Sequence, residues 1–273
     1  MNLHESLNSG RGIKMRTTER ISKRASSFLR NFWEICVRGI IVLSSFFLRK
    51  RTLKISAGME DIEYDELHDN PSLAKIIVSR DNPTYSSIDG VLYSKDGTKL
   101  IRFPPASKKS TLQVPDSVSS IENGAFWDCT SLTKLTIPNS VTSIGDGAFK
   151  GCTSLTKLTI PDSVTSIESY AFCECTSLTK ITISDSVTSI GQSAFEGCTS
   201  LTEITIPNSV TFIGYGAFFD CTSLTKITIP DSVTSIRYEA FDACPVTIIA
   251  VPDSYAWNYA KEKHIKVVAP DKE

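Results

Sequence analysis

The stretch Pro115–Ile137, PDSVSSIENGAFWDCTSLTKLTI, decides the fold because the chain repeats it with few changes. The period is 23 residues, and it continues without slippage as far as Cys244. A fixed period in this range is typical of a solenoid, in which each repeat forms one coil that stacks on its neighbours. The later copies begin at Pro138, Pro161, Ser184, Pro207 and Pro230, and the last of them is cut short.

Apolar residues recur at the same places in every copy and predict the interior of the array. The first four columns are represented by Val118, Ile121, Phe126 and Cys129, and an alanine precedes each phenylalanine. The segment Leu132–Ile137 then has the spacing Leu-x-x-Leu-x-Leu, with isoleucine at its last place. That spacing is the signature of leucine-rich repeats, which have one short strand per repeat. One repeat buries too little apolar surface to fold alone, so each coil should depend on its neighbours.

Neighbouring strands should pair in parallel and in register, about 4.8 Å apart, so that each column becomes a ladder of like side chains. The strand residues that alternate with the buried ones then point outward on the concave face. We interpret this face as the candidate interaction surface and call it the Lys/Thr surface. Its members are Lys134, Thr136, Lys157, Thr159, Lys180, Thr182, Glu203, Thr205, Lys226 and Thr228.

The phrase IPDSVTSIGxxAFxxCTSLTKITIP resembles the BspA-like subclass of leucine-rich repeats, which occurs in surface proteins of bacteria and of some protists. The resemblance covers roughly Leu53–Val268 and rests on two elements that recur in phase, Ser-Val-Thr-Ser-Ile and Ala-Phe-x-x-Cys. It implies a leucine-rich-repeat solenoid with a parallel β-sheet on the concave face. Short turns or 3-10 segments are expected on the convex side, and an α/β cap at the C-terminal end.

Four segments are predicted along the chain. Residues 1–50 are a basic leader that contains a hydrophobic segment, 32–48, and residues 51–114 hold degenerate repeats with a hairpin insertion. Residues 115–244 hold the regular repeats, and residues 245–273 form the C-terminal cap. In the cap, Ser254 is a suitable N-cap for a short helix that a last strand follows.

The insertion follows from a length difference between two neighbouring repeats. Residues 79–114 number 36 where 23 are expected, and two apolar runs flank Asp96-Gly97, which predicts a hairpin. The side chains of Tyr85, Tyr93, Arg102 and Phe103 are either a contact patch on this hairpin or part of its packing.

The hydrophobic segment 32–48 leaves two interpretations open. Its uninterrupted apolar run is shorter than the ~20 residues that span a bilayer. It is either a targeting or anchor segment, which would associate the chain with a membrane, or an amphipathic helix that caps the first coil.

Cysteine usage predicts free thiols and no metal site. Six of the eight cysteines lie in one column, one per repeat, which is the arrangement of a small buried hydrophobic residue. Parallel side chains in a ladder rarely present the dihedral angle of a disulfide. Clustered Cys/His pairs of the kind that hold zinc do not occur.

The sequence predicts no enzyme and no cofactor. His4, His68 and His264 lie in three different segments, and the common nucleotide-binding and hydrolase motifs do not occur. Residues 1–60 contain 12 of the 29 Lys and Arg and 4 of the 30 Asp and Glu, which leaves 17 against 26 for the remainder. The excess of acidic residues in the array argues against nucleic acid as its partner.

The leading hypothesis is therefore a monomeric, non-enzymatic protein-interaction or adhesion module that is secreted or at the cell surface. Its partner would be a protein or another macromolecular surface. The alternative is an intracellular structural scaffold or spacer in the cytoplasm. A third idea, ice binding by the threonine ladders, fits less well because lysine takes half of the outward sites.

Overall fold

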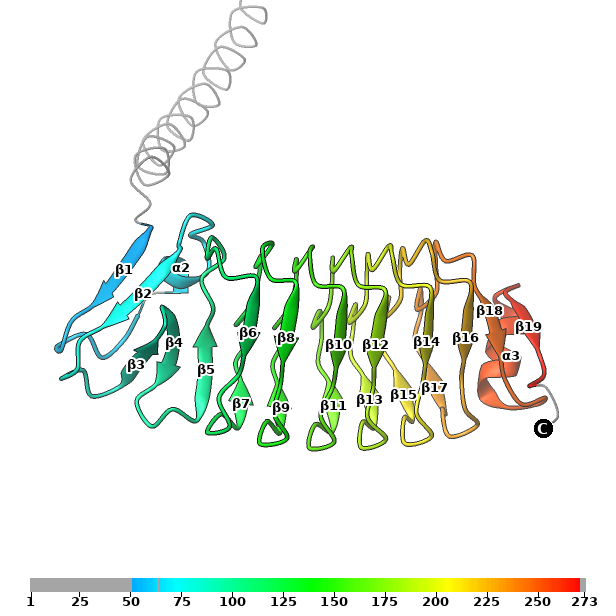
Figure 1. The fold of residues 1–273 in the computed structure, drawn as a ribbon. Coiled ribbons are helices and arrows are strands. Elements are labelled where there is room, and N and C mark those ends of the chain that lie inside the picture. Colours follow the sequence, from blue (N-terminus) through cyan, green and yellow to red (C-terminus); the bar gives the residue numbers. More distant parts are fainter. Residues whose placement is uncertain (1–50, 63, 271–273) are drawn as a thin grey trace, which may run out of the picture. The chain divides into compact units, whose positions relative to one another are not determined.

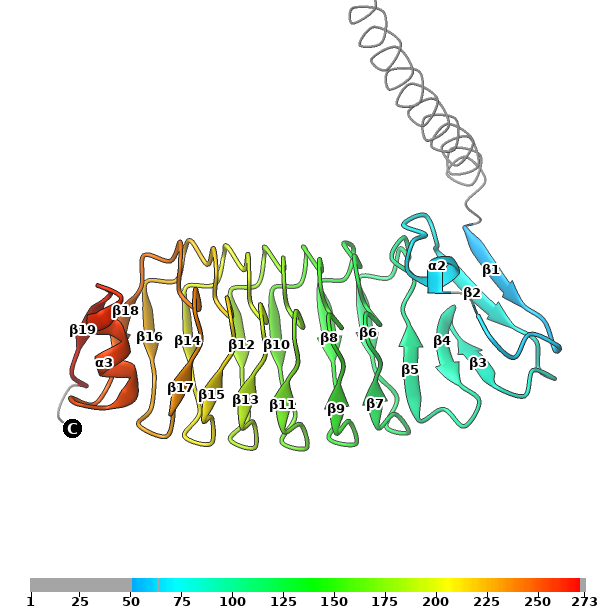
Figure 2. The same cartoon turned by 180° about the vertical axis from the view of Figure 1, so that it is seen from behind.

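A computed structural model of the chain describes residues 51–62 and 64–270. The basic leader, residues 1–50, and its hydrophobic segment 32–48 lie outside the described residues, so both interpretations of that segment stay open. The described residues form a parallel β-solenoid whose coils stack side by side along one axis, as Figure 1 and Figure 2 show from opposite sides. The predicted leucine-rich-repeat solenoid is confirmed.

One strand per coil forms the predicted ladder, and the paired strands of the regular repeats run parallel with an offset of 23 residues. The partners include Leu112 with Leu135 and Ile204 with Ile227. The strands are β1 (Thr52–Ile55), β2 (Lys75–Val78), β6 (Thr111–Gln113), β8 (Lys134–Thr136), β10 (Lys157–Thr159), β12 (Lys180–Thr182), β14 (Glu203–Thr205), β16 (Lys226–Thr228), β18 (Thr247–Ile249) and β19 (Lys266–Val268). Beyond the first pair, hydrogen bonding divides this ladder into the sheets β6-β8, β10-β12 and β14-β16-β18-β19.

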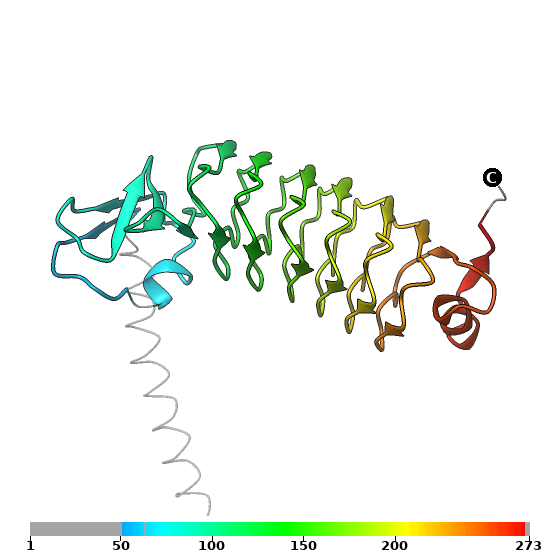
Figure 3. The same ribbon diagram turned by 90° about the horizontal axis from the view of Figure 1, so that it is seen from below.

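A second parallel ladder, which the sequence analysis did not predict, lies on the other side of each coil. In Figure 3 the two sets of strands form rows on opposite sides of the array. The second ladder is made of two-residue strands that end in the isoleucine column. They are β7 (Ser120–Ile121), β9 (Ser143–Ile144), β11 (Ser166–Ile167), β13 (Ser189–Ile190), β15 (Phe212–Ile213) and β17 (Ser235–Ile236). The remainder of each coil is turns, without 3-10 helix in the part of the chain that the structure describes.

The core between the two ladders consists of stacked columns. Neighbouring phenylalanine rings are nearly parallel, with centroids 5.4 Å apart for Phe172 and Phe195 and 5.3 Å apart for Phe195 and Phe218. The cysteine column lies beside them, buried except for the half-buried Cys244, and its thiols are free. The Cys198 Sγ donates a hydrogen bond of 3.2 Å to the carbonyl oxygen of Phe172 in the preceding repeat. The thiols thus fill space and join successive coils, as predicted for core cysteines.

The N-terminal part contains one worn coil and an antiparallel meander. Strands β1 and β2 pair with the same offset as the regular repeats, and α2 (Tyr64–Leu67) lies between them in the chain. The meander is β3 (Tyr85–Ile88), β4 (Val91–Ser94) and β5 (Lys99–Arg102), and β5 continues into the second ladder through β7. The hairpin predicted at Asp96-Gly97 joins β4 to β5, and a further tight turn joins β3 to β4.

Three of the four side chains proposed as either a contact patch or hairpin packing belong to the packing. Tyr93, Arg102 and Phe103 are buried. The Arg102 guanidinium donates hydrogen bonds to the carbonyl oxygens of Leu67 at 2.9 Å and Gly124 at 2.6 Å, which ties the meander to the first regular repeat. The contact-patch interpretation is therefore wrong for these three side chains.

The C-terminal end of the core is covered by α3 (Tyr255–Glu262) and β19. Ser254 caps the helix, since its hydroxyl accepts a hydrogen bond of 3.2 Å from the Trp257 amide. Tyr259 packs edge-on against Phe241, the last ring of the phenylalanine column, at a centroid distance of 6.2 Å. Within residues 51–62 and 64–270, no helix has the length and apolar character needed to span a membrane.

Candidate interaction surface

The structure brings all ten residues of the Lys/Thr surface together on the strands β8, β10, β12, β14 and β16. Each of these strands has the pattern exposed, buried, exposed, so the central Leu or Ile faces the core and the Lys or Glu and Thr face solvent. Alternation of this kind follows from the pleat of a β-strand. The surface is therefore an exposed set of like side chains in rows.

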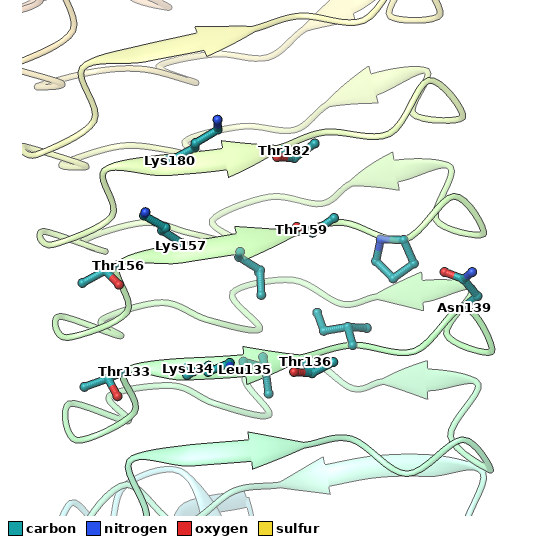
Figure 4. Close-up of a pocket in the computed structure, with 13 residues that line it drawn as sticks. Thr133, Lys134, Leu135, Thr136, Asn139, Thr156, Lys157, Thr159, Lys180 and Thr182 are labelled. Carbon is teal, nitrogen blue, oxygen red and sulfur yellow. The ribbon is translucent and has the colours of Figure 1, made fainter.

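A shallow groove of about 640 Å³ runs across three of these strands, β8, β10 and β12. Figure 4 shows Lys157 and Lys180 near the start of their strands and Thr159 and Thr182 near the end. The apolar part of the lining includes Leu135 and Leu158. The groove covers the interruption of the sheet between β8 and β10, and a smaller one of about 340 Å³ covers the interruption between β12 and β14.

The groove over β8, β10 and β12 is positively charged. Within the described residues, Lys134, Lys157 and Lys180 form no ion pair, and the hydroxyls of Thr136, Thr159 and Thr182 have no hydrogen-bond partner. The row of positive charge ends at Glu203, which takes the lysine position on β14. The groove thus offers unpaired ammonium groups and free hydroxyls, which suit hydrogen bonding to a carboxylate-bearing partner.

Among the described residues, the Lys/Thr surface holds no metal-binding cluster and no histidine. In the ranges 51–62 and 64–270, no three His, Cys, Asp or Glu residues lie close enough to hold a metal ion. His68 lies in the N-terminal part and His264 beyond α3, while His4 is outside the described residues. Burial and then the charge of Arg102 lower the pKa of His68 to about 4.

Comparison with known proteins identifies the kind of array. The sequence profile of the BspA type leucine-rich repeat region matches residues 103–220 and 188–259, with six copies. The chain belongs to the BspA-type leucine-rich-repeat family. The resemblance drawn from the repeated phrase is thereby confirmed, and the fold is one that typically serves as a non-enzymatic binding scaffold.

Solved structures of bacterial leucine-rich repeat proteins resemble this chain. A leucine-rich repeat protein from Eubacterium ventriosum is 26% identical with a TM-score of 0.59, and the match covers 71% of this chain and 59% of that one. A leucine rich cell surface protein from Faecalibacterium prausnitzii is 30% identical with a TM-score of 0.52, and the match covers 76% of this chain and 50% of that one. The T. pallidum leucine rich repeat protein is 27% identical with a TM-score of 0.55, and the match covers 70% of this chain and 97% of that one. This chain thus spans little more than half the length of the first two. No curated protein matches its sequence.

A second groove, which sequence reasoning missed, lies on the side of the second ladder. It has a volume of about 520 Å³ and is lined by Phe212, Tyr215 and Arg237, among others. A signal for it exists in the sequence, because Phe212 interrupts a column that is serine in every other copy of the BspA-type repeat.

Proposed function

We propose that the chain is a non-enzymatic protein-interaction or adhesion module that is secreted or at the cell surface and binds its partner as a monomer. The observation that carries the proposal is the groove on the Lys/Thr surface, with unpaired lysines and free threonine hydroxyls on neighbouring strands of the solenoid. Leucine-rich-repeat proteins generally bind protein partners. The F. prausnitzii structure is of a cell surface protein, which supports the same location here.

Each of the four segments has a part in this proposal. Residues 115–244 would carry the Lys/Thr surface, while residues 51–114 and 245–273 would close the two ends of the core. Closed ends are needed because a solenoid otherwise exposes the apolar face of its last coil. Residues 1–50 would export or anchor the array. Because the lysine row is positive, the complementary partner surface is acidic, and binding should weaken as salt rises.

The second candidate is an intracellular spacer, which the uniformity of the Lys/Thr rows favours. Protease treatment of unlysed source cells separates the two. Release of repeat peptides from intact cells supports the surface module, and protection until lysis supports the spacer.

A charge-reversal variant tests the surface itself. Lysine-directed cross-linking on intact cells identifies the partner, and its affinity is then compared for the wild-type chain and for K134E/K157E/K180E. The matched control is K95E/K150E/K261E, which changes the net charge equally at positions off the Lys/Thr surface. We expect the first variant to weaken binding about tenfold or more and the control to stay within about twofold. Equal binding by all three proteins would remove the Lys/Thr surface from the proposal.

A further inference from the structure

Differences between the repeats gather in the turn that follows the second ladder. The Lys/Thr surface is uniform, with Glu203 as its one departure among ten positions. By contrast, the position after the isoleucine column is Glu, Gly, Glu, Gly, Gly and Arg in the six copies, ending at Arg237. The next position is Asn, Asp, Ser, Gln, Tyr and Tyr, ending at Tyr238. Recognition of one particular partner needs positions that are not equivalent, and these positions line the second groove.

Two glycines open the middle of this groove. A Cβ atom on Gly191 would lie 2.7 Å from the carbonyl carbon of Glu168, and one on Gly214 would lie 2.5 Å from that of Gly191. The coils therefore approach so closely that a side chain has no room at these two positions. The side chains of Glu168 and Arg237 are left at the two ends, three repeats or about 15 Å apart.

Aromatic side chains form the walls of the groove and are held in place by their neighbours. The Arg237 guanidinium lies over the Phe212 ring, 5.5 Å from its centroid. The Tyr215 and Tyr238 rings stack with a centroid distance of 6.3 Å, and the Tyr215 hydroxyl donates a hydrogen bond to the Glu239 carboxylate. Walls that are already ordered lose little conformational entropy when a ligand binds. Tyr and Arg are also the residue types that contribute most to protein interfaces.

The two ends of the groove carry opposite charges that the described residues leave unpaired. Glu168 accepts a hydrogen bond of 2.5 Å from the Ser166 hydroxyl but forms no ion pair within residues 51–62 and 64–270. Arg237 also forms no ion pair in that part of the chain, and both side chains are exposed. A ligand that complements the groove therefore has a positive group at one end, a negative group at the other and an apolar group between them.

We propose that this groove binds an extended peptide segment of a protein partner. A Lys or Arg of the peptide lies at Glu168, an Asp or Glu lies at Arg237, and an apolar side chain packs between Phe212 and Tyr215. At about 3.3 Å per residue, the two charged residues of the peptide are four or five positions apart. The proposal rests on the protein-interaction function above, but it uses a separate face of the solenoid. It makes the second groove, which Phe212 lines, the site that selects the partner.

Fluorescence anisotropy with four labelled, end-capped peptides tests the proposal on the full chain. The probes are Lys-Ser-Leu-Ser-Asp and its reversed sequence Asp-Ser-Leu-Ser-Lys, with Lys-Ser-Leu-Ser-Lys and Asp-Ser-Leu-Ser-Asp as charge controls. At least one of the two dipolar peptides should bind about tenfold more tightly than either control. The variants F212S and R237E introduce residues that other repeats carry in the same columns, so they preserve the fold. Circular dichroism checks this.

The variants make the test specific to the groove. F212S should weaken the dipolar peptide about tenfold, and R237E should reverse the preference so that Lys-Ser-Leu-Ser-Lys binds best. K134E/K157E/K180E should bind the dipolar peptide as the wild type does, which separates a failure of this proposal from a failure of the Lys/Thr surface. The proposal is overturned if neither dipolar peptide exceeds the controls or if R237E leaves the preference unchanged. It is also overturned if cellopentaose binds in place of the peptides and F212S abolishes that binding.

Discussion

The cysteine ladder should make the free energy of unfolding depend strongly on pH between 8 and 10. Cys129, Cys152, Cys175 and Cys198 are buried, and burial raises the pKa of each thiol from its ordinary value of 9.0, to about 12 for Cys129. In the unfolded chain the thiols regain their ordinary pKa. As pH rises past 9, the unfolded chain therefore loses protons that the folded chain keeps, and this favours unfolding. The stabilisation is complete below pH 9 and is lost as pH rises toward the folded pKa.

The size of the effect follows from the number of buried thiols. Between pH 8 and pH 10, each thiol that stays protonated only in the folded state lowers the free energy of unfolding by about 1.4 kcal/mol. The four thiols named above lower it by about 5 kcal/mol, which is comparable to the whole stability of many domains. The buried Cys173, whose pKa burial raises to about 11, adds to this loss. Alkaline sensitivity of this size would be a direct consequence of placing one cysteine in every coil.

Urea unfolding followed by circular dichroism at pH 8 and pH 10 measures this loss. Cys36, outside the described residues, is replaced by serine in every protein. Cys198→Ala should reduce the loss by about 1.4 kcal/mol, because one titrating thiol is gone. Leu201→Ala, in the same repeat and equally buried, should lower the stability at both pH values and leave the loss unchanged. The reasoning would be refuted if the free energy of unfolding of the wild type fell by less than about 2 kcal/mol between pH 8 and pH 10, or if it fell equally in the two variants.

Two further predictions concern packing between the coils. Phe195→Ala should lower the free energy of unfolding, measured with urea, by about 3–5 kcal/mol. Phe195→Leu keeps most of the side-chain volume but loses the stacking against two neighbouring rings, so it should lower the free energy of unfolding by about 1–2 kcal/mol. Equal losses for the two variants would argue against a contribution from stacking. Gly214→Ala should cost about 1–3 kcal/mol because its Cβ meets the backbone of the preceding coil, whereas Gly58→Ala, with no atom within 4 Å, should change the melting temperature little; a similar shift for both would contradict the close approach.

The regular part of the fold could be predicted from the sequence because each column has one chemistry in every copy. Buried leucine and isoleucine at Leu135 and its equivalents place the strand residues on either side of them at the surface, as the structure confirms. The phenylalanine and cysteine columns likewise identify the core. A ladder needs only a fixed period and alternating polarity, and both can be counted in the sequence.

The second ladder and its groove could not be found in the same way. Strands as short as Ser189–Ile190 are too short to show the alternation that marks a strand, so only stacking of the coils reveals them. The groove depends on two glycines of adjacent repeats lying side by side, which is a relation between coils. Its signs in the sequence are Phe212 in a column of serines and the differences at the two positions that follow the isoleucine column. The candidate Lys/Thr surface was predicted residue by residue, while its use in binding stays a prediction.

The offset of 23 residues between paired strands of the regular repeats also determines how the array responds to a pulling force. Each regular coil is hydrogen-bonded only to the coils before and after it, so a force applied to the ends would detach coils one after another. A detached coil lengthens the chain by nearly its full extended length, about 75 Å. A module built in this way between a cell and its partner would extend in equal steps under load. The work of pulling would then unfold coils before it broke the contact with the partner.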